Sequence, residues 1–374
     1  MDYSTVAGVL RRCCVIAGLW CGAAIAEPAY DHHVKLTPEN SAIGNFPAQK
    51  QPILTIRSGD TVKFDTGGGA GWQRSKADPD AWLKEHHVPI TADAAPVRET
   101  IEVLAKTQRY AGIESGHLLV GPVAIEDAMP GDSIEVRVLL VEPRIPYGTT
   151  GRTPGRGLKQ LELPEDQRPP AKVTVLDLER DVGLFAPGVE VPLGPFMGVM
   201  ALLPPESDGP NRRSGPPGLF AGNLDLKELT TGSTLYIPVF HPGGLFYTGD
   251  AHAAQGDGEI SGTAIETANT AILQFILHKG VTLSAPRVET PTHYIAIGLD
   301  EDLDNAMQMA YDQTVEWLAE LKGFDSATTT PLASIGIDYR ITQIVDGTKG
   351  VHAMIPKKLF IDHPDDYWYR PAKK

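Results

Sequence analysis

Cysteine is almost absent from this sequence of 374 residues. The only three cysteines are Cys13, Cys14 and Cys21, near the amino terminus. The rest of the chain therefore has no disulfide and no thiol nucleophile. Chemistry that depends on a cysteine is excluded for everything that follows residue 21.

The sequence also lacks a basic excess and a long apolar run. Its formal net charge is -14, so it has no broad positive field that would attract phosphates, and we do not expect a nucleic-acid partner. No stretch after residue 26 approaches the roughly 20 apolar residues of a membrane-spanning helix. We expect no membrane span in the mature chain.

Several common catalytic motifs are missing as well. The chain contains no G-x-S-x-G, no Walker A sequence, no H-E-x-x-H, and no G-x-G-x-x-G after a strand-like segment. ATP and nicotinamide chemistry therefore lose their usual binding motifs, and the chain lacks the Gly/Ser-rich nucleophile loop of Ser-Lys enzymes. Any hydrolysis is expected to use an activated water.

The first 26 residues have the pattern of an export signal. Arg11 and Arg12 precede a mostly apolar stretch over 13–23, and Ala24-Ile25-Ala26 supplies small residues where signal peptidase cleaves. We predict cleavage after Ala26 and a periplasmic or secreted product. The sequence leaves open whether the general or the twin-arginine route is used.

Glycine and proline are abundant, with 38 and 31 residues, which predicts many turns and many short strands. Alternating apolar and polar residues favour strands over 53–57, 61–65, 133–142 and 234–240. Segments rich in glycine, proline and arginine over 143–170 and 204–217 are expected to be long surface loops.

One helix is predicted over 302–322, where apolar residues recur every three or four positions and Lys322-Gly323 ends the pattern. Strand-like segments over 292–298 and 334–345 flank it. We therefore divide the chain into the signal segment 1–26, a β-rich catalytic region 27–285, and an α+β region 286–374 that packs on it.

The densest chemical signal lies between Gly249 and Glu266. Asp250 and His252 are two residues apart, so on a strand they share a face and suit one divalent ion. Glu259 or Glu266 would move the proton of a metal-activated water. Alternatively, the segment is a glycine-rich turn whose polar side chains bind backbone amides. Gln255 and Asp257 complete this cluster.

Histidines elsewhere give weaker signals. His117 precedes an apolar strand, and the ligand and structural interpretations are evenly balanced there. The pairs His32-His33 and His86-His87 are more typical of solvated surface residues.

Several separated runs, in the same order along the chain, resemble the acetamidase/formamidase family. They are residues 52–64 with SGDTVKF, His117 followed by GPVAIEDAMPGD, GNLDLK from Gly222, GSTLYIPVF from Gly232, GDAHAAQGDGE from Gly249, SGTAIE from Ser261 and ITQIVDGTKGVHAMIPKKLF from Ile341.

This resemblance implies a mainly β fold, a jelly-roll-like β-sandwich with a smaller α+β carboxy-terminal part. It also implies a homo-oligomer that hydrolyses short-chain amides to ammonia and a carboxylate, with a divalent metal, Zn or Ca, at its centre. The matching polar positions are His117, Asn223, Asp225, Lys227, Asp250, His252, Gln255, Asp257, Glu259 and Glu266.

Two features depart from the family pattern. Where family members tend to carry an acidic residue in a glycine-containing loop, this chain has Gly67-Gly68-Gly69-Ala70-Gly71 after Asp65. The second departure is the export signal, because the family's amidases are associated with nitrogen acquisition inside the cell.

The sequence thus favours an exported amide hydrolase. In this hypothesis Asp250, His252 and His117 hold the metal, Glu266 or Glu259 is the base, and Asn223, Asp225 and Gln255 bind the substrate. Two alternatives remain at this point: a periplasmic small-amide-binding or inactive scaffold protein, and a hydrolase of a different C–N substrate.

Overall fold

The computed structural model describes residues 27–75, 77–88, 94–151, 171–361 and 367–369. The expected signal segment 1–26 lies outside these residues, as do most of the expected loop 143–170 and most of the tail after 361. Within the described residues no helix combines the length and the apolar composition needed to cross a membrane.

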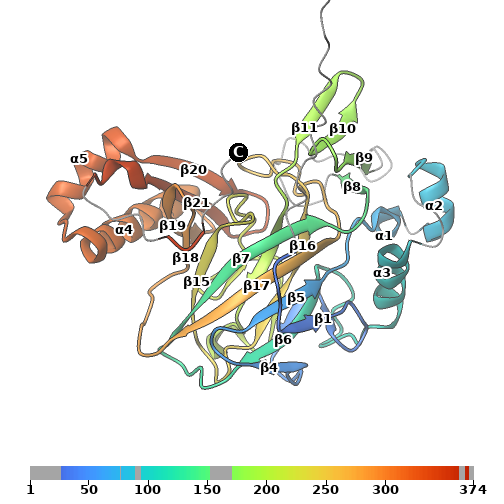
Figure 1. The fold of residues 1–374 in the computed structure, drawn as a ribbon, viewed down its shortest axis with the longest axis horizontal. Helices are drawn as coiled ribbons and strands as arrows, with labels where there is room; N and C mark the ends of the chain where they lie inside the picture. The colour runs from blue at the N-terminus through green and yellow to red at the C-terminus, as the bar shows by residue number, and fades with distance from the viewer. Residues whose placement is uncertain (1–26, 76, 89–93, 152–170, 362–366, 370–374) are drawn as a thin grey trace, which may run out of the picture.

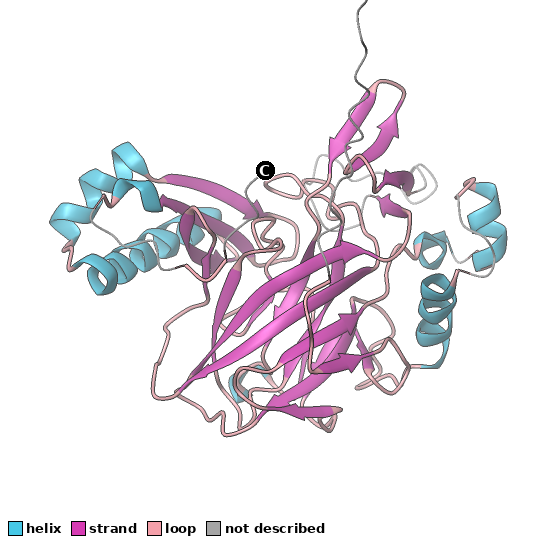
Figure 2. Cartoon of the chain, viewed as in Figure 1, coloured by secondary structure: helices cyan, strands magenta, loops and turns pink. Residues whose placement is uncertain are grey.

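Two large β-sheets form the body of the molecule (Figures 1 and 2). In spatial order, the nine-stranded sheet contains β1 (His32–Val34), β5 (Thr61–Asp65), β17 (Asn269–His278), β7 (Ser133–Pro143), β15 (Thr234–Pro238), β18 (Arg287–Glu289), β19 (His293–Asp300), β21 (Lys349–Pro356) and β20 (Asp338–Gln343). The six-stranded sheet contains β14 (Ala221–Asn223), β12 (Phe196–Ala201), β16 (Phe246–His252), β6 (Leu118–Ile125) and β2 (Ser41–Ile43), with β4 (Leu54–Ile56) paired to β6.

The main core fills the space between these two sheets. Strand β7 places the alternate residues Ile134, Val136 and Val138 in this core, as the period of two along a strand requires. Strands of the second sheet contribute residues such as Val120 and Phe246 to the same cluster. The expected β-sandwich is confirmed.

Smaller elements complete the β structure. A four-stranded sheet contains β11 (Val189–Pro192), β10 (Val182–Ala186), β9 (Lys172–Asp177) and β8 (Tyr147–Thr150), and β13 (Asn211–Arg213) pairs with β3 (Asn45–Pro47). Short 3-10 turns lie at Glu206–Asp208 and Lys357–Leu359. The loops expected over 143–170 and 204–217 therefore contain the short strands β8 and β13, which the sequence prediction missed because their backbone pairing has no apolar periodicity.

The carboxy-terminal α+β part lies at one end of the nine-stranded sheet (Figure 1). Helix α4 (Leu303–Lys322) covers β19 and β21, with Trp317 and Leu318 packed against Tyr294 and Ile355, and α5 (Ser326–Gly336) packs on α4. Asp302 caps α4 and Gly323 ends it in a left-handed conformation, as the sequence predicts.

The strand expected over 334–345 is shorter than predicted. Helix α5 continues to Gly336, and β20 begins only at Asp338. The apolar residues Ile335 and Ile337 misled the prediction, because a short apolar stretch does not distinguish the end of a helix from the start of a strand.

Three helices between the first strands and β6 were not predicted from the sequence. They are α1 (Gly71–Ser75), α2 (Pro79–Glu85) and α3 (Ala95–Lys106), and they lie at the opposite end of the molecule from α4 and α5 (Figure 1). Trp72, Trp82 and Val97 join Tyr147 in a separate apolar cluster that attaches these helices to the sandwich.

Candidate active site

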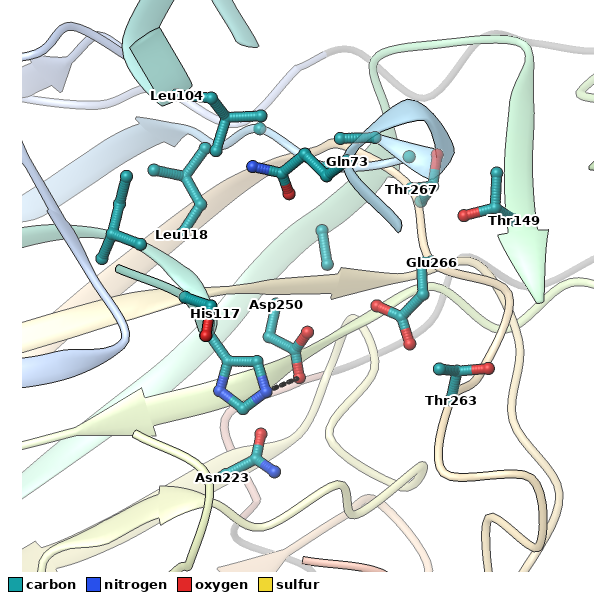
Figure 3. A pocket seen from close by; sticks show the side chains of 18 of the residues that line it. Gln73, Leu104, His117, Leu118, Thr149, Asn223, Asp250, Thr263, Glu266 and Thr267 are labelled. Atoms are coloured by element: carbon teal, nitrogen blue, oxygen red, sulfur yellow. Dashed lines mark ion pairs between the residues drawn. The ribbon is translucent and has the colours of Figure 1, made fainter. Parts of the chain in front are cut away.

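A cavity of about 590 Å³ collects most of the predicted site residues. His117 lies just before β6, Asn223 ends β14, Asp250 lies in β16, and Glu266 lies in the segment between β16 and β17. Figure 3 shows their side chains facing one another across this space. The folded chain thus brings together residues that are up to 149 positions apart in the sequence.

The imidazole of His252 lies at the buried end of the site. Its Nε2 atom is 3.4 Å from Asp250 Oδ2 and 3.4 Å from Glu266 Oε2, while Nδ1 is 3.8 Å from Asp225 Oδ1. These gaps exceed an ordinary hydrogen bond, so the imidazole has carboxylates on both sides but bonds to none of them. The predicted proximity of Asp250 and His252 is observed.

His117 approaches the same carboxylate from the cavity. Its Nε2 atom is 3.9 Å from Asp250 Oδ2, the ion pair drawn in Figure 3. Asp250 therefore has two imidazoles nearby, one from β16 and one from the residue just before β6. This arrangement makes Asp250 the residue that connects the three expected ligands.

Glu266 is held by its backbone and by one of its side-chain oxygens. Its backbone exchanges two hydrogen bonds with Thr149 of β8, and its Oε1 accepts from the Ala264 backbone amide. This leaves Oε2 directed at His252. The side chain is 20% exposed and lines the cavity, so it can reach a bound molecule.

A second group of carboxylates lies behind Asp250. Asn223 Nδ2 donates to Asp225 Oδ2 at 2.9 Å and to Asp346 Oδ2 at 2.7 Å. Asp346 was not singled out from the sequence, although it lies inside the run from Ile341 that carries the family resemblance. The backbone amides of Val345 and Asp346 both donate to Gln343 Oε1, which fixes the turn that carries Asp346.

The site is electrostatically crowded. Burial raises the pKa of Asp225 well above its ordinary value, and the charges of Glu259 and Asp250 raise it further. Burial also raises the pKa of Glu259 well above its usual range, with Asp346 and Glu266 adding to the effect against the influence of His252. Both carboxyl groups therefore resist ionisation unless a positive charge is nearby.

The pKa of Asp250 shifts in the opposite direction from those of Asp225 and Glu259, because two imidazoles lie beside it. Burial opposes its ionisation, but the charges of His117 and His252 outweigh burial and lower the pKa of Asp250. For His252, burial favours the neutral ring, yet the charges of Glu266 and Asp250 raise its pKa well above the ordinary value. Asp250 and His252 thus stabilise each other's charged forms.

Three of the site carboxylates lie on strained backbone. Asp225, Asp250 and Glu259 have φ angles of 48°, 54° and 44°, in the left-handed region that side-chain-bearing residues rarely adopt. Neighbouring hydrogen bonds fix this backbone. Next to Glu259, for example, the Gly258 amide donates to the Thr342 carbonyl and the Gly258 carbonyl accepts from the Ile344 amide. Such strain is concentrated at functional sites.

The remaining predicted residues lie at the edge of the site or outside it. Gln255 is not part of the cavity lining and donates from Nε2 to the Asp225 backbone carbonyl at 2.7 Å. Lys227 and Asp257 pair with each other at 2.8 Å, also outside the lining. These three residues hold the loops that carry Asp225 and Glu259.

The acid of the glycine-containing loop is not replaced by Asp65. Asp65 does not line the cavity, and its carboxylate lies 2.7 Å from His33 and 3.5 Å from Arg144. His32 and His86 likewise have other partners, Asp60 and the Trp82 carbonyl.

Three overlapping sets of side chains in the site could hold a metal ion. Within each set the ligand atoms lie within 4.8 Å of one another; the sets are Asp225, Asp250 and His252; His252, Glu259 and Glu266; and Asp225, Glu259 and Asp346. Several of their buried atoms have no hydrogen-bond partner, namely both ring nitrogens of His252, Asp225 Oδ1 and Glu259 Oε2. Buried polar atoms without partners are costly, and a cation bound among them would remove that cost.

Comparison with known proteins finds one family that this chain resembles. Residues 209–362, which carry most of this site, match the model of the Acetamidase/Formamidase family. Over this segment the chain is similar to the acetamidase/formamidase family. Among curated proteins, the formamidase of Methylophilus methylotrophus is 26% identical over 68% of this chain and 80% of its own length. The acetamidase of Mycolicibacterium smegmatis is 27% identical over 39% of this chain and 49% of its own length.

Solved structures of family members have the same fold. An acetamidase from Bacillus halodurans is 28% identical, covers 88% of this chain and 98% of its own, and superposes with a TM-score of 0.68. The acetamidase of Yersinia enterocolitica is 28% identical over 89% of this chain and 94% of its own, with a TM-score of 0.70. The resemblance predicted from the sequence runs is confirmed.

Proposed function

We propose that this protein belongs to the acetamidase/formamidase family and hydrolyses the C–N bond of carboxamides, releasing ammonia and a carboxylate. The observation that carries the proposal is the buried imidazole of His252 beside Asp250 and Glu266, two carboxylates that line a cavity, in a chain whose named relatives are formamidases and acetamidases. Hydrolysis needs a water and a proton acceptor together, and this arrangement supplies the acceptor.

We further propose that the site holds a divalent metal ion, Zn or Ca. Asp250, His252 and His117 would hold it, and the partnerless atoms of Asp225 and Glu259 fit additional contacts. A bound ion would lower the pKa of a water and polarise the amide carbonyl. The mixture of carboxylate and imidazole donors suits Zn²⁺, whereas a carboxylate-rich set suits Ca²⁺.

In this proposal Glu266 is the general base. It lines the cavity, and its Oε2 is free of hydrogen bonds other than the long contact to His252. Glu266 takes the proton of the attacking water as the O–C bond forms, and transfers it to the amide nitrogen as the C–N bond breaks. Glu259 is less suited, because it is 7% exposed and surrounded by other carboxylates.

Asn223 orients the substrate amide. Its Nδ2 is already committed to Asp225 and Asp346, so its Oδ1, which has no partner, is presented as an acceptor. An acceptor at this position matches the NH₂ group of a carboxamide, which has two donors. In Figure 3 this oxygen points towards His117 and Asp250.

The first test is ammonia release from formamide, acetamide and propionamide by the purified protein, before and after chelation. We expect activity that chelation abolishes and a divalent ion restores. Glu266→Gln should lower kcat by about 100-fold or more, since a general base contributes 10²–10⁴ to the rate. Unchanged activity after verified metal removal would contradict the metal, and ammonia release from no amide would contradict the hydrolase.

A second candidate function is binding of small amides without turnover, favoured by the glycine loop that replaces the family's acidic residue. Calorimetric binding of an amide with no ammonia release would support it. Loss of turnover in His252→Ala, with the fold retained, would count against it.

We also propose that the protein is exported and assembles with copies of itself. The pattern of residues 11–26 supports export, and sequencing of the cell-derived protein should find Glu27 at its amino terminus. The family resemblance supports a homo-oligomer, which light scattering on the purified protein would measure.

A further inference from the structure

The cavity has an apolar side in addition to its acidic end. Ile43 of β2, Leu104 of α3 and Leu118 of β6 line the same space as Asp250 and Glu266. In Figure 3, Leu104 and Leu118 are drawn on the side of the cavity away from Asn223. Leu104 is only partly buried, so it presents apolar surface to whatever fills the cavity.

The glycine loop forms a surface of this cavity that has few side chains. Residues 67–71 contribute four glycines and one alanine to the lining. A Cβ at Gly68 would lie 1.8 Å from the Thr267 carbonyl oxygen, and one at Gly67 would lie 2.8 Å from Leu118. The loop therefore packs its backbone closely against its neighbours, and a side chain at these positions would collide with them.

The volume of the cavity exceeds what a small amide needs. About 590 Å³ lies within the range of roughly 300–1,000 Å³ that is typical of pockets for much larger ligands. It equals the volume of about 20 water molecules in the liquid, whereas acetamide has four non-hydrogen atoms. A formamide or acetamide molecule at the carboxylates would leave the leucine flank in contact with water.

We propose that Ile43, Leu104 and Leu118 form an acyl-binding subsite, and that the substrate is a primary amide whose apolar acyl chain is several carbons longer than that of acetamide. This inference rests on the proposed amide hydrolysis. The carboxamide binds at the acidic end, near Asn223 and Glu266, and the acyl chain extends along the leucine flank. An uncharged chain is specified because the three side chains of the subsite are apolar; the ionisable residues Glu114 and Arg213 line other parts of the same cavity.

The test is the ratio of kcat/KM for hexanamide to kcat/KM for acetamide, measured by ammonia release. Burial of each additional methylene should raise kcat/KM about fourfold, because it contributes roughly the free energy of one buried CH₂. Both values of kcat/KM are measured on the same preparation, so a loss of folded protein lowers both equally and leaves their ratio unchanged. A wild-type ratio near or below one would overturn the inference while leaving amide hydrolysis intact.

Two substitutions locate the subsite. Leu104→Ala should lower the ratio about tenfold or more. Ile101→Ala is the matched control, since Ile101 lies on the same helix, is also partly buried and does not line the cavity. An unchanged ratio in Leu104→Ala, or an equal fall in Ile101→Ala, would contradict the assignment of the flank.

Binding measurements separate this inference from the proposed activity. Calorimetry on the Glu266→Gln variant compares the affinities for hexanamide and acetamide without turnover. Tighter binding of hexanamide that Leu104→Ala removes would support the subsite even if no amide were hydrolysed. Equal affinities would overturn it.

Discussion

Asp132 has a more complete set of partners than any carboxylate described in the active site. Its Oδ2 accepts from Lys279 Nζ at 2.7 Å and from the Met129 amide at 2.8 Å, and its Oδ1 accepts from the Gly280 amide at 2.8 Å. The Lys279 hydrogen bond is the main cause that lowers the pKa of Asp132 from 3.8 to about 2. The ionised form therefore stabilises the turn that precedes β7.

This pKa predicts how the stability depends on pH. A depressed carboxyl pKa gives stability that is fully present above the ordinary value of 3.8 and is lost as the pH falls towards 2. Asp132→Asn should lower the thermal unfolding midpoint at pH 7, and the difference from wild type should shrink near pH 2. Asp127→Asn, a neighbouring exposed position, is the control; an equal effect there would contradict the role of Asp132.

At the residue scale, the sequence predicted part of the site. The spacing of Asp250 and His252 was informative because alternate residues of a strand share a face. Asp346 was not found by this reasoning, since its position depends on a turn near β21 that meets Asn223 from 123 residues away. Residues joined only by tertiary packing leave no local pattern.

Helix α4 packs on β19 at a point where there is no room for a side chain. A Cβ at Gly298 would lie 2.0 Å from the Ala306 carbonyl oxygen and 2.3 Å from the Ala310 amide nitrogen. Ala306 and Ala310 are themselves fully buried small residues of α4. The helix and the strand thus approach each other through small residues on both sides.

Gly298→Ala should therefore be strongly destabilising. Because the obstructing atoms belong to the backbone, the helix must shift, and we expect a loss of about 3 kcal/mol in the free energy of unfolding. Denaturant titration would measure it, with Gly194→Ala as the control, since a Cβ there meets nothing within 4 Å. A loss below about 1 kcal/mol in Gly298→Ala would show that α4 moves easily.

At the scale of elements, the length of a helix decided whether its apolar periodicity could be recognised in the sequence. Helix α4 has 20 residues, an Asp302 cap and a Gly323 stop, so its periodicity is clear. Helices α1 and α2 have five and seven residues, too short for a reliable period of 3.6. The Asp78-Pro79 pair at the start of α2 was the one local signal available.

For the whole molecule, the nine-stranded sheet joins the two expected regions. Strand β15 pairs with β18, and β18 pairs with β19, so the ladder continues across residue 285. Ile295 and Met354 also belong to the main core between the sheets. The carboxy-terminal region is thus bonded to the sandwich through backbone and core alike.

We therefore expect a single cooperative unfolding transition. Far-ultraviolet circular dichroism, which follows all the strands, and tryptophan fluorescence, which includes Trp317 of α4 and Trp82 of α2, should give the same midpoint. Two separated midpoints would show that the α4 and α5 layer unfolds independently of the sandwich.

The left-handed backbone at Asp225, Asp250 and Glu259 has a consequence for protein engineering. Glycine and asparagine adopt the left-handed conformation readily, and neither adds a negative charge to this crowded site. Selection for thermostability alone would therefore favour replacing these residues and would remove three carboxylates of the proposed active site. A stabilised catalyst of this family should instead be sought by changing positions distant from the cavity, with these three side chains held constant.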